Sequence, residues 1–286
     1  MKGIWSAVVT PLDESFVPDA GLAARRYRDL LRRGCDGLNV LGTTGEAMSL
    51  DAQERMRFME ALATSGLPME RMMVGTGAAS LGDAVRLTRH AFECRFVAAL
   101  IMPPFFYRDV SDDGIVVFFD IIFARTNPPP KSVLLYNFPR MSGIAFHAAL
   151  VDRLLREFPE PIAGVKDSSN DPQLQSEIIA RHPALRVFPG SESDLLAAKS
   201  RGAAGCISGS VALWPELAHA VFAEDDRRKA RELARKRAAL DGVPFIPAVR
   251  YLIAQSENDR AWQRALPPQT PLTDEAARLL MQRVGR

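Results

Sequence analysis

Eight short apolar runs recur along this 286-residue chain, and each has the length and composition of a buried strand. They cover residues 4–9, 37–41, 72–75, 98–102, 133–136, 162–166, 187–188 and 205–207. The runs are continuously apolar rather than alternating, which is typical of parallel strands buried on both faces. This pattern predicts a parallel sheet.

An amphipathic stretch with helical periodicity follows each apolar run. In the first stretch, Leu22, Tyr27, Leu30 and Leu31 fall on one helical face. The eight stretches cover residues 20–33, 51–62, 82–92, 113–124, 148–157, 173–181, 194–201 and 215–222. Eight strand–helix units in unbroken succession predict an α/β fold, a closed (β/α)8 TIM barrel, rather than an open sheet.

Three further helical stretches follow the eighth unit, at residues 224–240, 247–255 and 273–284. They are too short to form a second fold of their own. The sequence therefore predicts a barrel of residues 1–223, with a C-terminal helical extension of residues 224–286 packed on the barrel.

The charge balance and the apolar runs exclude several classes of protein. Lysine and arginine number 36 against 34 for aspartate and glutamate, which leaves a net charge of +2. This balance, without basic stretches interleaved with aromatics, indicates no nucleic-acid partner. The longest apolar runs, 96–107 and 115–119, are too short or proline-broken to cross a membrane. The N-terminus lacks the apolar core of a signal peptide, so we expect a cytoplasmic protein.

Cysteine and histidine usage indicates neither disulfides nor a metal site. Cys35, Cys94 and Cys206 are too scattered for a disulfide framework or a paired-cysteine metal knuckle. The four histidines fall in predicted helices or at helix ends, without the spacing of metal ligands. They are His90, His147, His182 and His219. We therefore predict that the protein needs neither a metal ion nor an organic cofactor.

Lysine is rare in this chain, and one lysine ends an apolar strand. Six lysines stand against thirty arginines, and Lys166 directly follows Ile162-Ala163-Gly164-Val165. The Lys166 stem could pack in the barrel while its ammonium pairs with a carboxylate. Alternatively, the amine could be a nucleophile that forms a Schiff base with a keto acid, which requires a neutral amine in an apolar site. Hydroxyl groups and glycines follow the other strands at the same rim, which favours the Schiff base.

The segment Gly42-Thr43-Thr44-Gly45-Glu46 joins the second strand to the next helix. Its glycines allow a tight turn, and its backbone amides can bind an anion such as a carboxylate. A capped turn without a ligand is the alternative. Tyr136 ends the fifth strand, and Tyr107 follows the fourth. Each is either an interface aromatic or a proton-transfer group beside the Schiff-base lysine.

In their order and spacing, five segments resemble the dihydrodipicolinate synthase and N-acetylneuraminate lyase family of Schiff-base-forming class I aldolases. The resemblance covers nearly the whole chain. It implies a (β/α)8 barrel with a C-terminal helical extension, usually assembled as a tetramer. The segments are Val9-Thr10-Pro11-Leu12-Asp13, Gly42-Thr43-Thr44-Gly45-Glu46, Gly75-Thr76-Gly77, Tyr136-Asn137-Phe138-Pro139 and Gly164-Val165-Lys166-Asp167.

The resemblance also implies a role for each matching residue. Lys166 would form the imine with pyruvate or another 2-keto acid. Tyr136 would transfer protons and would be polarised by the hydroxyl of Thr43. The amides of Thr43 and Thr44 would hold the carboxylate of the keto acid. Ile207 matches the residue whose carbonyl lies near the lysine.

In the synthase, a second tyrosine from a neighbouring subunit completes the proton relay. Phe105-Phe106-Tyr107 stands where the synthase has paired tyrosines, so the relay position falls on either Phe106 or Tyr107. Consecutive aromatic residues on a rim loop are typical of a subunit contact, although they could also turn inward onto the barrel. We expect a homo-oligomer, either a dimer or a tetramer.

Two other segments depart from the synthase pattern. Met141 stands in place of an arginine that binds the carboxylate of aspartate semialdehyde, and Arg140 lies one residue early. Lys166-Asp167-Ser168-Ser169 is more similar to the sugar-acid aldolases. The resemblance therefore defines the mechanism better than it defines the second substrate.

We accordingly expect a lyase that condenses pyruvate, or a longer 2-keto acid, with an aldehyde, or that cleaves such a product. Dihydrodipicolinate synthesis itself is one alternative. Aldol cleavage or dehydration of a 2-keto-3-deoxy sugar acid is another, and a non-catalytic barrel that binds keto acids is a third. In each case the expected partner is a small molecule, with neither nucleic acid nor membrane.

Overall fold

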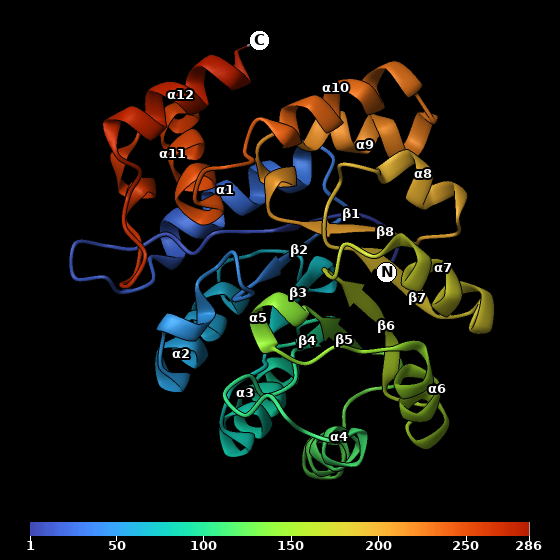
Figure 1. The fold of residues 1–286 in the computed structure, drawn as a ribbon. Coiled ribbons are helices and arrows are strands. Elements are labelled where there is room, and N and C mark those ends of the chain that lie inside the picture. The colour runs from blue at the N-terminus through green and yellow to red at the C-terminus, as the bar shows by residue number, and fades with distance from the viewer. Residues whose placement is uncertain (286) are drawn as a thin grey trace.

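Eight parallel strands form a nearly closed barrel surrounded by helices in the computed structural model, which describes residues 1–285 (Figure 1). The strands pair in the order β7-β6-β5-β4-β3-β2-β1-β8. Between β7 and β8 the Ala204 amide donates to the Val187 carbonyl at 2.9 Å. The predicted (β/α)8 TIM barrel is confirmed. The strands are β1 (Gly3–Ala7), β2 (Gly37–Val40), β3 (Met72–Gly75), β4 (Ala98–Ile101), β5 (Val133–Asn137), β6 (Ile162–Asp167), β7 (Arg186–Pro189) and β8 (Gly205–Ser208).

The outer helices begin where the sequence supplies a capping side chain. Asp19, Asp51, Ser80 and Ser111 each accept a hydrogen bond from a backbone amide in the first turn of the following helix. The outer helices are α1 (Ala20–Arg32), α2 (Ala52–Ala63), α3 (Leu81–Glu93), α4 (Asp112–Thr126), α6 (Ala148–Glu157), α7 (Pro172–Arg181), α8 (Leu195–Ser200) and α9 (Pro215–Glu224). A single-turn helix, α5 (Pro139–Ser142), follows β5 and was not expected from the sequence.

The core consists of two apolar layers. One lies between the strands and the outer helices, and the other fills the inside of the barrel. The inner layer includes Trp5, Leu134, Phe188 and Ile207. A methyl group on Gly37 would lie 2.4 Å from the Trp5 ring, so the missing side chain makes room for that ring. The barrel is therefore a packed interior rather than a pore.

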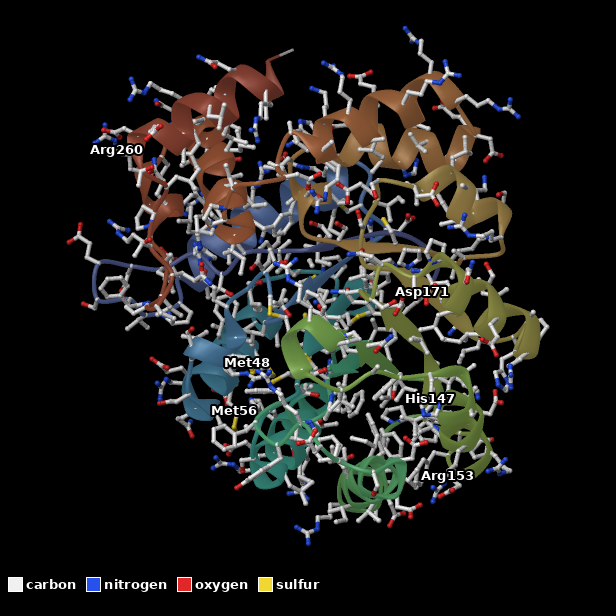
Figure 2. All side chains as sticks on the ribbon, in the orientation of Figure 1. Met48, Met56, His147, Arg153, Asp171 and Arg260 are labelled. Atoms are coloured by element: carbon white, nitrogen blue, oxygen red, sulfur yellow. The ribbon has the colours of Figure 1, made fainter. Side chains whose placement is uncertain are left out.

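Charged side chains project outward around the ring of helices (Figure 2). His147, on the outer rim, caps α6, because its Nδ1 accepts a hydrogen bond from the Leu150 amide at 3.2 Å. Arg153, on the same helix, donates to Glu157 at 2.7 Å. Outer-rim side chains such as these stabilise helix ends and surfaces.

In the described part of the chain, three α-helices follow the barrel: α10 (Arg227–Ala238), α11 (Phe245–Glu257) and α12 (Asp274–Val284). Helix α10 packs on α9, and α12 packs on α11. The division into a barrel of residues 1–223 and an extension of residues 224–286 stays a prediction. Within residues 1–285, every helix is too short or too polar to cross a membrane.

Candidate active site

Lys166 faces the inside of the barrel from β6. Lys166 is only 4% exposed, and it pairs in register with Tyr136 of β5 on one side and with Phe188 of β7 on the other. The lysine Nζ lies 4.3 Å from the centroid of the Tyr136 ring. Within residues 1–285, no ion pair joins this lysine to a carboxylate. The structure thus does not show the lysine–carboxylate pair that a purely structural role predicts.

Apolar side chains line the barrel interior that Lys166 faces. Leu134, Ala163, Phe188 and Ile207 belong to the inner cluster that also contains Tyr136, and each of these four is at most 3% exposed. A nucleophilic lysine attacks a carbonyl carbon as the neutral amine. The position of Lys166 over the Tyr136 ring, without a carboxylate partner within residues 1–285, suits that role.

Tyr136 connects the lysine to the loop after β2. Its hydroxyl lies 3.3 Å from the Thr43 hydroxyl, and either oxygen can be the donor. The residue is 4% exposed, and its ring packs against Phe138 with 5.7 Å between centroids. Lysine, tyrosine and threonine thus form a continuous chain of contacts at the carboxyl ends of β6, β5 and β2.

The next residues along β5 and β6 hold these two side chains in place. Asn137 donates from Nδ2 to Oδ1 of Asp167 at 2.6 Å. Asp167 also accepts from Gln175 of α7 at 2.8 Å, and Asn137 accepts from the Phe146 amide at 2.9 Å. Because successive strand residues face opposite sides, this network lies behind the site and fixes the register of Tyr136 beside Lys166. Asn137 and Asp167 carry no signal in the sequence that indicates this supporting role.

The loop after β2 presents two amides at the barrel mouth. Within residues 1–285, neither the Thr43 nor the Thr44 amide donates a hydrogen bond. Thr10 donates from its hydroxyl to the Gly45 carbonyl at 2.8 Å. A methyl group on Gly45 would lie 3.1 Å from the Val8 carbonyl, so this close approach favours glycine. The loop is therefore tightly held while two of its amides remain available to an anion.

A buried arginine supports the neighbouring loop after β3. Arg55, in the first turn of α2, donates to the carbonyls of Gly75 and Gly77 at 2.9 and 3.1 Å. Burial lowers the pKa of the Arg55 guanidinium to about 10. Gly75 abuts the start of the Thr43 loop, since a methyl group there would lie 2.2 Å from the Leu41 carbonyl. The Gly75-Thr76-Gly77 segment thus has a structural role behind the mouth.

The other predicted site residues are dispersed. Ile207 lies in the inner apolar cluster, and Thr44 is buried at the mouth. Tyr107 is 74% exposed, and its ring meets that of Phe106, 77% exposed, edge to face at 5.2 Å. Arg140 is exposed on α5. Within residues 1–285, Tyr107 and Arg140 make no hydrogen bond to the lysine–tyrosine–threonine chain.

Comparison with known proteins identifies the family. The model of the dihydrodipicolinate synthetase family matches residues 1–284. A DapA-like lyase of Chloroflexus aurantiacus is 32% identical over 279 residues, which cover 97% of this chain and 90% of that protein. The 4-hydroxy-tetrahydrodipicolinate synthase of Thermus thermophilus is 31% identical over 272 residues, which cover 91% of this chain and 89% of that protein. The crystal structure of dihydrodipicolinate synthase from Agrobacterium tumefaciens superposes with a TM-score of 0.93 at 26% identity, and the match covers 100% of this chain and 99% of that one. This chain therefore belongs to the dihydrodipicolinate synthetase family.

Proposed function

We propose that this chain is a Schiff-base-forming lyase of the class I aldolase type that condenses or cleaves pyruvate, or a longer 2-keto acid, with an aldehyde. The observation that carries the proposal is the buried Lys166, which contacts Tyr136 and has no carboxylate partner within residues 1–285. The expectation that no metal or organic cofactor takes part, and the expected cytoplasmic location, remain predictions from the sequence.

In the first step, the neutral amine of Lys166 attacks the keto carbon. The carboxylate of the keto acid accepts hydrogen bonds from the amides of Thr43 and Thr44, which places its carbonyl above the lysine. A carbon–nitrogen bond forms, and the proton released from nitrogen reaches the former carbonyl oxygen through the Tyr136 hydroxyl, which gives a carbinolamine. Tyr136 then relays a second proton, taken up from solvent, to the carbinolamine hydroxyl, so that water leaves and a protonated imine remains.

In the second step, the imine nitrogen withdraws electrons from the adjacent methyl carbon. Tyr136 accepts one proton from that carbon, which gives an enamine, and the enamine attacks the aldehyde carbon and forms the new carbon–carbon bond. Tyr136 then returns the proton to the aldehyde oxygen as charge develops there, and Thr43 orients the tyrosine hydroxyl. Water then hydrolyses the imine and regenerates Lys166; cleavage is the reverse sequence.

The second substrate is where this chain departs from the synthase. The resemblance puts Met141 at the place of the carboxylate-binding arginine, and the Met141 side chain is exposed on α5. Hydrogen bonds to a charged group contribute about 1.5–3 kcal/mol each. Losing one is expected to weaken binding of aspartate semialdehyde by about tenfold to a hundredfold. A sugar-derived or aliphatic aldehyde carries no such carboxylate, so its binding is weakened less by the missing arginine.

A substrate panel tests the proposed function. Pyruvate is incubated with aspartate semialdehyde, sugar-derived aldehydes and aliphatic aldehydes, and 2-keto-3-deoxy acids are tested for cleavage and dehydration. We expect turnover, with at least one sugar-derived or aliphatic substrate exceeding aspartate semialdehyde in kcat/KM. No turnover in either direction would favour the non-catalytic keto-acid-binding barrel. If aspartate semialdehyde condenses faster than every other aldehyde, the proposed specificity is wrong. If an Arg140→Ala variant then loses this activity, Arg140 binds the carboxylate of aspartate semialdehyde.

We also propose that the protein is a dimer or tetramer in which the loop after β4 meets a second subunit. Phe106 and Tyr107 support this, because both rings are largely exposed on one loop. Sedimentation at micromolar concentration is expected to show a dimer or tetramer for the wild-type protein. A Phe106→Ser/Tyr107→Ser variant is expected to form a smaller species than wild type and to have reduced activity. A wild-type monomer would contradict a shared site. The outward-facing Val117→Ser on α4 serves as the control.

A further inference from the structure

The loop that carries Thr43 and Thr44 ends at a buried glutamate. Glu46 has a left-handed backbone, with φ 54° and ψ 32°, which is uncommon for a residue with a side chain. Its amide donates to the Thr43 carbonyl at 3.1 Å, so the conformation of Glu46 and the position of Thr43 are linked directly. Glu46 therefore helps to set the course of the anion-binding loop.

The partner of Glu46 lies in the C-terminal extension. Arg250 of α11 donates from Nε to Oε2 of Glu46 at 2.6 Å, and its Nη2 contacts the same oxygen. The side chains are 1% and 2% exposed. The other carboxylate oxygen accepts from the Leu266 amide at 2.9 Å, beyond α11. Both carboxylate oxygens of Glu46 are thus held by residues more than two hundred positions later in the sequence.

Arg250 also contacts the segment after β1, which is itself bonded to the loop. Its Nη2 donates to the Thr10 carbonyl at 2.8 Å, and the Thr10 hydroxyl donates to Gly45. One guanidinium therefore joins α11, the segment after β1 and the end of the loop after β2. A buried charge pair with its remaining donors and acceptors satisfied is rigid, whereas the loss of either partner leaves an uncompensated charge.

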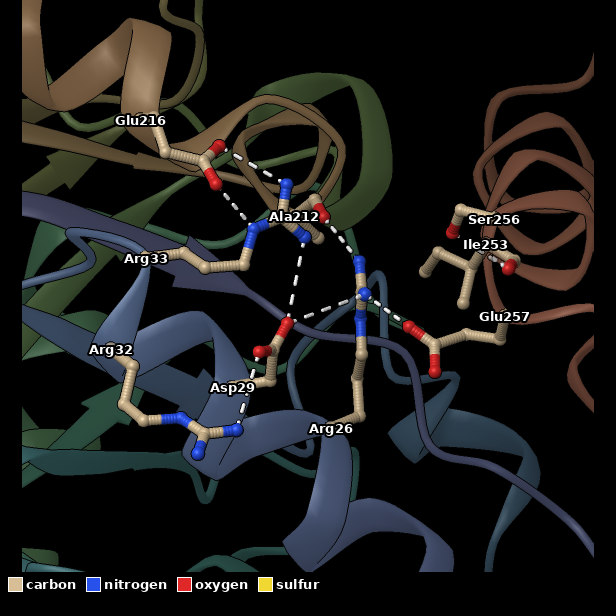
Figure 3. A network of polar contacts seen from close by, with 9 residues as sticks. All are labelled: Arg26, Asp29, Arg32, Arg33, Ala212, Glu216, Ile253, Ser256 and Glu257. Carbon is tan, nitrogen blue, oxygen red and sulfur yellow. Dashed lines mark hydrogen bonds and ion pairs between the residues drawn. The ribbon is translucent and has the colours of Figure 1, made fainter.

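Another buried arginine, Arg26, forms a comparable ion pair away from the loop. Arg26 of α1 forms an ion pair with Glu257 at the end of α11 and donates to the Ala212 carbonyl at 2.7 Å (Figure 3). This pair attaches the same helix to the barrel, and within residues 1–285 neither partner forms a hydrogen bond or ion pair with the loop from Gly42 to Glu46. The pair of Arg26 and Glu257 therefore only attaches the extension to the barrel, whereas the pair of Glu46 and Arg250 also holds the loop.

We propose that Glu46 and Arg250 are positioning residues through which the C-terminal extension holds the Thr43 and Thr44 amides against the keto-acid carboxylate. The inference rests on the proposed function and adds a structural determinant of keto-acid affinity that lies outside the barrel strands. The inference is tested by the pyruvate concentration that half-saturates the protein. If the two residues only attached the extension, their replacement would lower the stability of the protein and leave this concentration unchanged.

The test traps the imine with borohydride at a series of pyruvate concentrations, so no aldehyde is needed. Wild-type protein is compared with Glu46→Gln, Arg250→Lys and the double variant Glu46→Gln/Arg250→Met, with Glu257→Gln as the control. The double variant removes both buried charges, so it leaves no uncompensated charge in the interior, but it also removes the ion pair that holds the loop. It can therefore be tested even where a single variant does not fold.

We expect half-saturation to rise by at least about tenfold in each folded variant at Glu46 or Arg250, a change in binding free energy of about 1.4 kcal/mol. Glu257→Gln is expected to lower the melting temperature and to leave half-saturation within about twofold of wild type. A folded double variant with wild-type half-saturation would overturn the inference alone. A wild-type protein that forms no adduct would overturn the proposed function, and the inference with it.

Discussion

Replacing Lys166 by arginine is expected to lower kcat/KM by a factor on the order of 10⁴ or more, the scale on which enzymes lose activity when a covalent nucleophile is removed. Arginine keeps a positive charge and a long stem, but its guanidinium stays protonated and does not attack a carbonyl. The measurement is kcat/KM on the best substrate of the panel, with circular dichroism to verify folding.

The matched control is Lys199→Arg. Lys199 lies on α8, outside the barrel, where its Nζ donates to Asp225 and to the Phe222 carbonyl, both at 2.7 Å. Arginine can make the same contacts, so we expect activity within about twofold of wild type. If the Lys166 variant folds and retains more than about a tenth of wild-type kcat/KM, the lysine is not the nucleophile.

Tyr136→Phe is expected to give the second-largest effect, a decrease in kcat of about 10²- to 10⁴-fold, as for loss of a general acid–base group. The substitution keeps the buried ring and removes only the hydroxyl that lies 3.3 Å from Thr43. KM for pyruvate should change little if the carboxylate is bound by the Thr43 and Thr44 amides, as we propose, rather than by the tyrosine. Steady-state kinetics separate the two parameters.

Tyr251→Phe is the control for this substitution. Tyr251 lies on α11 and is partly buried, and within residues 1–285 its hydroxyl makes no hydrogen bond. We expect its kcat to match wild type. A Tyr136→Phe variant with wild-type kcat would show that another group, or water, transfers the protons.

The barrel could be predicted from the sequence because its signal is periodic. Buried parallel strands require continuous apolar runs, and eight of these alternate with amphipathic helices. The ends of the elements were less certain. Val8 and Val9 continue the first apolar run and are buried, but β1 ends at Ala7, because burial extends beyond strand pairing. Helix α5 was missed because a single turn contains too few residues to show a period.

Part of the site was predictable for the same topological reason. Tyr136 and Lys166 are the next-to-last residues of β5 and β6, and consecutive strands such as these are neighbours in the barrel, so their side chains meet. The pair formed by Glu46 and Arg250 was not predictable, because 204 positions separate the two residues in the sequence and only the packing of α11 brings them together. A buried charge gives no periodic signal that links it to a distant partner.

Tyr107 marks a different limit. The sequence placed it after β4 on a rim loop, and its ring is exposed there. Its proposed role in proton transfer depends on a second subunit, and the contacts between subunits follow no periodicity in a single chain. The oligomeric state therefore bears directly on whether Tyr107 takes part in the reaction.

The most direct test of the account is to incubate the protein with pyruvate, reduce it with borohydride and map the adduct by peptide mass spectrometry. Reduction converts an imine into a stable secondary amine, so the modified lysine is identified by the mass of its peptide. We expect a single reduced pyruvyl group, on Lys166 and on none of the other lysines. An adduct on a different lysine, or no adduct on folded protein at saturating pyruvate, would contradict the assignment of Lys166 as the Schiff-base nucleophile.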